Sequence, residues 1–182
     1  MKIENQKPVI LVIDDDKSNI DLILNILPHY DCIPCLSGKL ALDIINEENI
    51  DLILLDIMMP DMDGFEVCSI IKLKPEFEHI PIIFLSSNDT IDSINHGFEL
   101  GAVDYVTKPF NPIELKCRIK THIKLLNFQK SLEEKNLKLE KLNQKIKEIA
   151  KSDLEKVYEE YSYLSDDDID LSHYLDNVSL DD

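Results

Sequence analysis

Five short apolar runs alternate along the chain with segments of helical periodicity, and this alternation limits the fold more than any other feature. The apolar runs cover residues 8–13, 32–36, 51–56, 80–85 and 102–106. The helical segments cover residues 17–27, 39–47, 65–74 and 90–100, and a further helix starts at Asn111-Pro112. Strands that alternate with helices in this way are typical of a parallel sheet covered on both faces. We therefore expect a doubly wound α/β domain with a five-stranded parallel sheet and an extended C-terminal helix.

Charged and hydroxyl side chains follow four of the five expected strands. Asp14 to Asp16 follow the first strand, Asp56 ends the third, Ser86 follows the fourth and Lys108 follows the fifth. Right-handed crossovers place the C-terminal ends of parallel strands along one edge of the sheet. The topology therefore predicts that these side chains converge, although no single motif requires it.

Such a group of side chains suits phosphoryl chemistry. Crowded carboxylates repel one another unless a cation lies between them. Oxygen ligands without a nearby His or Cys favour Mg²⁺, followed by Mn²⁺ or Ca²⁺. A hydroxyl and an ammonium opposite the acids suit the anionic oxygens of a phosphoryl group, and Asp56 could itself be the nucleophile. The alternative is that the acids are solvated loop residues and that Lys108 is a surface cation.

Four motifs give the chain a family resemblance. VIDDDKSN, LILLDIMMPDMDG, IIFLSS and GAVDYVTKPF, in this order, resemble the receiver domain of two-component response regulators over residues 7–124. The resemblance implies a flavodoxin-like fold and a cis bond between Lys108 and Pro109. Ser87 stands where the family usually has alanine, a small departure that we do not expect to abolish function.

The resemblance also assigns roles to individual residues. Asp56 matches the phosphoacceptor, Ser86 the switch hydroxyl, Lys108 the lysine that contacts the phosphoryl group, and Tyr105 the switch aromatic. Mg²⁺, or Mn²⁺, is expected to bind four ligands: the carboxylates of Asp14, Asp15 and Asp56 and the backbone carbonyl of Met58. The implied donor is a sensor histidine kinase or a phosphotransfer protein. The side chain of Met58 cannot orient an attacking water, although Asn88 could, so we expect a long-lived phosphoryl group.

Phosphorylation is expected to alter the surface formed by the helix at 90–100, the strand at 102–106 and the last helix. Asp104 and Arg118 lie on this surface. They could form an intermolecular ion pair in a homodimer, or equally a local exposed pair.

A heptad pattern continues the last helix beyond the domain. Apolar residues recur every seven positions in two series, which are Leu125, Leu132, Leu139 and Ile146, and Phe128, Leu142 and Ile149. Lys135 interrupts the second series. We expect residues 1–124 to form the receiver domain and residues 125–150 a coiled-coil extension that dimerises in parallel. The alternative is a single amphipathic helix that packs on its own domain or on a partner.

Charge divides the chain in the same places. The net charge of −17 is distributed as −10 over residues 1–124, +2 over residues 125–150 and −9 over residues 151–182. Such acidity argues against nucleic-acid binding. The acidic segment 151–182 is expected to be disordered or to dock on a partner through its tyrosines and leucines. Because residues 125–182 contain no helix-turn-helix, basic patch or catalytic motif, we expect output through contact with an unknown downstream protein.

The sequence contains neither a signal peptide nor an apolar segment of membrane-spanning length, so we expect a cytoplasmic protein with no membrane contact. We expect no enzyme activity of its own. The rival enzyme class, the haloacid-dehalogenase phosphatases, needs a second acid two residues after the nucleophile, where this chain has Met58. A structural scaffold is the third alternative. Cys32 and Cys35 form a CxxC spacing that could mark a metal or redox site, but the simpler interpretation is packing in a strand.

Overall fold

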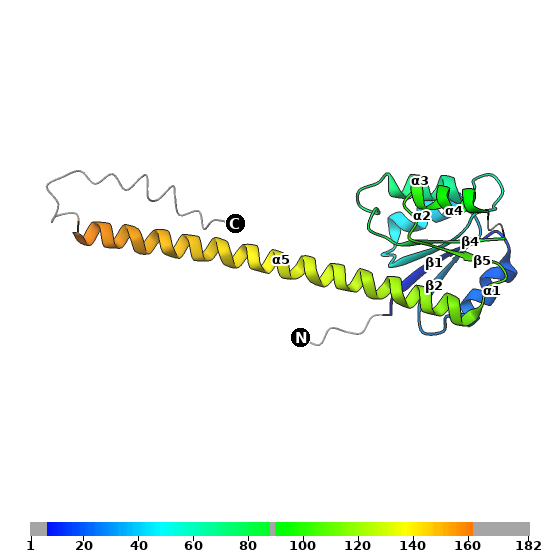
Figure 1. Ribbon diagram of the computed structural model, residues 1–182, viewed down its shortest axis with the longest axis horizontal. Coiled ribbons are helices and arrows are strands. Elements are labelled where there is room, and N and C mark those ends of the chain that lie inside the picture. The colour runs from blue at the N-terminus through cyan, green and yellow to red at the C-terminus, as the bar shows by residue number, and fades with distance from the viewer. Residues whose placement is uncertain (1–6, 88–89, 162–182) are drawn as a thin grey trace. The chain divides into compact units, whose positions relative to one another are not determined.

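The computed structural model describes residues 7–87 and 90–161 and contains one parallel sheet with helices on both faces (Figure 1). In chain order the elements are β1 (Val9–Ile13), α1 (Lys17–Ile26), β2 (Asp31–Cys35), α2 (Gly38–Glu47), β3 (Leu52–Asp56), α3 (Gly64–Lys72), β4 (Ile82–Ser86), α4 (Ile91–Glu99), β5 (Asp104–Thr107) and α5 (Pro112–Tyr161). The strand order is β2-β1-β3-β4-β5, and every neighbouring pair is parallel. The expected flavodoxin-like fold is therefore confirmed.

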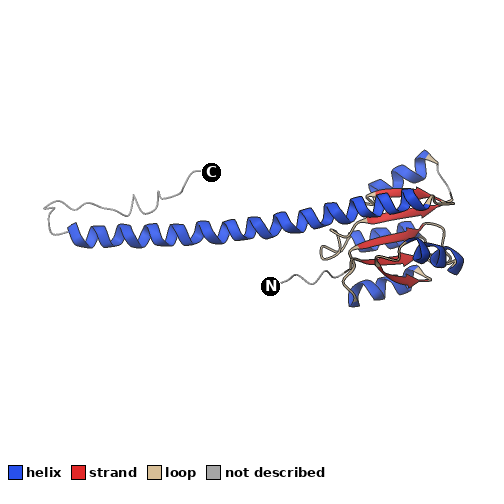
Figure 2. Cartoon of the chain, turned by 90° about the horizontal axis from the view of Figure 1, so that it is seen from below, coloured by secondary structure: helices blue, strands red, loops and turns tan. Residues whose placement is uncertain are grey.

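The sheet separates two apolar cores, because successive side chains of a strand point to opposite faces. Leu11 and Leu55 point into the core that α2, α3 and α4 cover, whereas Ile10 and Leu54 point into the core that α1 and the first part of α5 cover. All four side chains are fully buried. Figure 2 shows the strands side by side between these helices. Burial on both faces explains why β1, β3 and β4 are continuous apolar runs in the sequence.

Short polar residues fix where the helices start. Asp16 caps α1 by accepting a hydrogen bond from the Ser18 N–H at 2.8 Å, so the third acid of the DDD run has a local structural role. Asp63 and Glu66 form a capping box at α3, in which each side chain accepts the backbone N–H of the other residue. Such caps satisfy N–H groups that have no partner within the helix.

Helix α5 is longer than the sequence analysis predicted. The chain divides into two compact units after Phe128, and α5 continues through the second unit to Tyr161, eleven residues beyond the expected end at 150. The acidity of residues 151–161 by itself predicts disorder. These residues contain no glycine or proline, however, and five of the eleven are Lys or Glu, which favour helix. Tyr163 and Tyr174 of the expected tail lie outside the described residues.

The described part of the second unit, residues 129–161, exposes an apolar series along its helix. Each of these side chains is at least 45% exposed: Leu132, Leu137, Leu139, Leu142, Ile146, Ile149 and Val157. None of the described helices is long and apolar enough to cross a membrane.

Gly64 lets α3 start directly against the end of β3. A Cβ atom at this position would lie 2.3 Å from the carbonyl oxygen of Asp56 and 2.9 Å from the Cα atom of Ile57. Both neighbours are backbone atoms that cannot rotate away. The backbone N–H of Gly64 also donates to the Ile57 carbonyl at 2.9 Å, which holds the turn closed.

We predict that Gly64→Ala lowers the free energy of unfolding by about 2 kcal/mol, because the added methyl group forces the backbone at Asp56 and Ile57 to shift. Urea denaturation followed by circular dichroism measures the change. Ser69→Ala, on the same helix, is the matched control and should change stability by less than about 0.5 kcal/mol. Equal stability of the two variants would contradict the packing argument.

Candidate functional site

The candidate site lies at the C-terminal edge of the sheet, where four neighbouring strands end together. Asp56, the last residue of β3, is in register with Leu85, next to Ser86 at the end of β4. The N–H of Lys108 donates to the Ser86 carbonyl at 2.7 Å, which places the residue after β5 beside the end of β4. Asp14 directly follows β1, and its N–H donates to the Cys35 carbonyl at 3.1 Å. The predicted convergence of these residues is therefore observed.

Lys108 joins the two buried acids of the site. Its Nζ lies 2.7 Å from Asp14 Oδ2 and 2.8 Å from Asp56 Oδ2. The Asp14 and Asp56 side chains are only 0% and 6% exposed, and Lys108 is 16% exposed. The ammonium therefore provides the counter-charge that two adjacent carboxylates need in a poorly solvated position.

Burial by itself shifts the pKa values of Asp56 and Lys108 in opposite directions. Burial raises the pKa of the Asp56 carboxyl, and Asp14 adds to this increase, although Lys108 opposes both. Burial by itself would lower the pKa of Lys108, but the hydrogen bonds to Asp14 and Asp56 outweigh it and raise that pKa above its ordinary value. Lys108 is therefore held as a cation.

Three carboxylates of the site lie close enough together to hold a metal ion. Asp14, Asp15 and Asp56 each offer an oxygen atom, and these atoms all lie within 4.8 Å of one another. The set contains only oxygen ligands, which fits a hard divalent cation such as Mg²⁺. The side chain of Asn19 donates to Asp14 Oδ1 at 3.0 Å and so orients this carboxylate. Sequence reasoning missed Asn19, which lies in the first turn of α1, because the sequence does not show which polar residue near the acids reaches Asp14.

The remaining predicted residues lie on, or directly after, the strands that end at this edge. Ser86 is fully buried at the end of β4. Tyr105 lies on β5 and is 9% exposed. The Met58 side chain is 67% exposed, and its backbone N–H is 3.4 Å from Asp56 Oδ1. The peptide bond between Lys108 and Pro109 is cis, as expected. Asn88, the residue considered for orienting water, lies outside the described residues.

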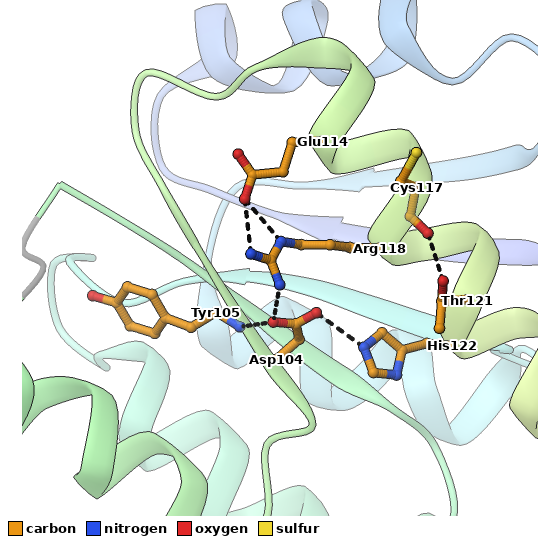
Figure 3. A network of polar contacts seen from close by, with 7 residues as sticks. All are labelled: Asp104, Tyr105, Glu114, Cys117, Arg118, Thr121 and His122. Carbon is orange, nitrogen blue, oxygen red and sulfur yellow. Dashed lines mark hydrogen bonds and ion pairs between the residues drawn. The ribbon is translucent and has the colours of Figure 1, made fainter.

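Asp104 and Arg118 form a pair within the chain (Figure 3). Arg118 Nη1 lies 2.7 Å from Asp104 Oδ1, and the same guanidinium also binds Glu114 at 2.8 Å. His122 Nε2 lies 3.0 Å from the second oxygen of Asp104. Within the single chain, the structure contains the local pair, which is one of the two alternatives predicted. Sequence reasoning missed His122, although its position four residues after Arg118 places both on one face of α5.

Several hydrogen bonds stabilise the charged form of Asp104. Burial raises the pKa of its carboxyl, but bonds from the Tyr105 N–H, His122 and Arg118 outweigh burial and hold the pKa below its usual value. Asp104 is therefore ionised at neutral pH and is shared by two side chains of α5.

The CxxC spacing is a packing feature. Cys32 packs against the core under α1 and α5, whereas Cys35 belongs to the core on the opposite face of the sheet. Both cysteines are free, and burial together with Asp31 raises the pKa of Cys32 to about 11. A shared metal or disulfide would need both sulfur atoms on one face.

Comparison with known proteins identifies the family of the chain. Residues 10–120 match the family model described as the response regulator receiver domain. The chain is 48% identical over 115 residues to a Vibrio cholerae protein named a probable cyclic di-GMP phosphodiesterase, covering 63% of this chain and 26% of that protein. It is 39% identical over 118 residues to the Bacillus subtilis transcriptional regulatory protein YvrH, covering 63% of this chain and 48% of the relative.

A solved structure gives the same result. The receiver domain of a Francisella response regulator superposes with a TM-score of 0.60 at 35% identity and covers 64% of this chain and 97% of that domain. The chain spans less than half of the length of the two curated relatives. Because the family model covers more than half of the chain and the site residues converge as described, the protein belongs to the receiver domain family of two-component response regulators.

Proposed function

We propose that this chain accepts a phosphoryl group on Asp56 from the phosphohistidine of a sensor histidine kinase or a phosphotransfer protein. The observation that carries the proposal is the contact of one ammonium, Lys108, with the carboxylates of Asp14 and Asp56 at the sheet edge of a receiver-family chain. Such transfer from a signalling kinase would take place in the cytoplasm.

The chemical step exchanges one bond to phosphorus for another. The P–N bond of the phosphohistidine breaks and leaves its electron pair on the imidazole nitrogen, while an oxygen of Asp56 forms the new P–O bond. The carboxylates of Asp14, Asp15 and Asp56 and the backbone carbonyl of Met58 would hold Mg²⁺ or Mn²⁺. A bound cation of this kind offsets negative charge on the transferring group.

The new charge would then rearrange the groups around Asp56. The phosphoryl oxygens attract the Lys108 ammonium and the Ser86 hydroxyl, so Lys108 exchanges part of its contact with the carboxylates for the phosphoryl group. Ser86 ends β4, and its movement would make room for the side chain of Tyr105. This change would alter the surface of α4, β5 and α5 and pass the signal on by protein contact.

We predict that acetyl phosphate with Mg²⁺ adds one phosphoryl group to the chain and that Asp56→Asn abolishes the addition, because an amide is not a nucleophile toward phosphorus. Intact-protein mass spectrometry measures the product. Asp61→Asn, the same change at an exposed acid nearby, should be labelled like the parent chain, and EDTA should prevent labelling. If the protein is a structural scaffold that is not phosphorylated, the parent chain will show no label. Label that persists in Asp56→Asn would exclude Asp56 as the acceptor.

We further predict that the phosphoryl group is long-lived, because the exposed thioether of Met58 cannot position a water molecule for attack. Met58→Asn should shorten the half-life of the label by about tenfold, since an amide can orient water. Met58→Leu is the matched control and should leave the half-life unchanged. The prediction is contradicted if the parent chain loses its label rapidly and Asn88→Ala does not slow this loss.

We also propose that the helical extension joins two copies of the chain in a parallel coiled coil. Its exposed apolar side chains recur at heptad spacing, and burial in a dimer would remove them from water. Lys135 would weaken this seam and help to fix its register. The surface of α4, β5 and α5 would contribute to the same homodimer. In such a dimer, Asp104 and Arg118 would have to share or exchange the ion-pair partners that they have within one chain.

Substitution of both Leu139 and Leu142 by lysine should convert the dimer to a monomer, because it places charge in the seam. Leu137→Lys is the matched control: Leu137 is equally exposed but lies outside the heptad series, so this variant should remain dimeric. Sedimentation velocity at several protein concentrations measures the assembly state. A parent chain that is monomeric at all concentrations would favour the alternative of a single amphipathic helix.

A further inference from the structure

A groove lies between α3 and α4, on the face of the sheet opposite to α1 and α5. It has a volume of about 450 Å³ and is open to solvent. Phe65, Ile70 and Leu100 give it an apolar wall, and the acids Asp63 and Glu66 line it beside them. None of these side chains belongs to the phosphoryl site.

The aromatic part of the groove is held in place from beneath. The Phe65 ring packs edge-on against the fully buried Phe84, with 5.2 Å between ring centroids, and against His96, with 4.8 Å between centroids. A Cβ atom at Gly97 would lie only 3.0 Å from the Phe84 ring, so α4 approaches β4 closely at this point. The groove therefore presents an ordered aromatic surface rather than a set of flexible side chains.

The acids of the groove are also fixed. The capping box of α3 uses Asp63 Oδ1 and Glu66 Oε2, at 2.9 and 3.1 Å from the opposite backbone nitrogens. Among the described residues, the second oxygen of each carboxylate has no hydrogen-bond or ion-pair partner, and no Lys or Arg lines the groove. Two oriented carboxylate oxygens thus accompany an aromatic and aliphatic wall in a domain whose net charge is −10 over residues 1–124.

We propose that this groove binds a segment of a partner protein that carries an arginine next to an aliphatic side chain. A planar guanidinium can donate to both carboxylates and stack on an aromatic ring, which the compact ammonium of lysine does less well. The neighbouring aliphatic side chain would pack on Ile70 and Leu100. This site goes beyond the acceptance of a phosphoryl group and does not depend on it.

The dipeptide acetyl-Arg-Leu-amide tests the proposal on the full, unphosphorylated chain. Titration followed by backbone amide NMR should show saturable shifts at Phe65, Ser69, His96 and Leu100 in the millimolar range, as expected for a small fragment. Acetyl-citrulline-Leu-amide has the same shape without the charge and should bind at least about fivefold more weakly.

Variants distinguish binding of the peptide in the groove from its attraction to the acidic surface in general. The double variant Asp63→Asn, Glu66→Gln keeps the oxygens of the capping box and should weaken binding about fivefold, since it removes both charges. Glu47→Gln, an exposed acid on α2, is the matched control and should bind like the parent chain. Ser69→Phe fills the groove without changing its charge and should abolish the shifts.

Several results would overturn the proposal. These are the absence of shifts at millimolar probe, equal binding of the citrulline peptide, shifts centred on another face, and undiminished binding to Ser69→Phe or to the double variant. The amide spectrum of each variant shows directly whether it is folded. Because no phosphoryl group is present, failure here leaves the role of Asp56 unaffected, and failure of phosphorylation leaves the groove unaffected.

Discussion

The contact of Lys108 with Asp14 and Asp56 is the interaction on which the site depends. The two carboxylates lie at the ends of two different strands and are almost completely buried. Without a cation, their mutual repulsion and loss of hydration would oppose the native arrangement. A single ammonium from the residue after β5 compensates both. The charge balance of the site thus requires the ends of β1, β3 and β5 to stay in place together. A cation that binds here would share this role, whereas a phosphoryl group on Asp56 would compete with Asp14 for the Lys108 ammonium.

The sequence predicted this arrangement because it follows from topology. Once five apolar runs alternate with helices, the position of Asp56 at the end of one run and of Lys108 after another places both residues at the same edge of the sheet. No knowledge of side-chain conformation is needed for that step. The strands can be recognised as apolar runs in the sequence because β1, β3 and β4 are buried on both faces and contain no alternating polar positions.

Features that depend on side-chain geometry or on weak helix signals were not predicted. Asn19 and His122 act by orienting Asp14 and Asp104, and a sequence does not show which of several nearby polar residues reaches a given carboxylate. The choice between a local and an intermolecular pair for Arg118 was open for the same reason. Helix α5 extends past residue 150 because the helix propensity of residues 151–161 outweighs their acidic composition.

Two short series of neighbouring residues connect the proposed groove with the phosphoryl site. Gly64 packs on the carbonyl of Asp56, and the next residue, Phe65, forms the groove wall. On β4, Phe84 lies beneath that wall and is two residues from Ser86, on the same side of the strand. A shift of Asp56 or Ser86 would therefore reach Phe65 through Gly64 or through Phe84. Thermodynamic linkage makes any such effect reciprocal: if phosphorylation at Asp56 changes the affinity of the groove, occupancy of the groove changes the free energy of the phosphorylated state by the same amount.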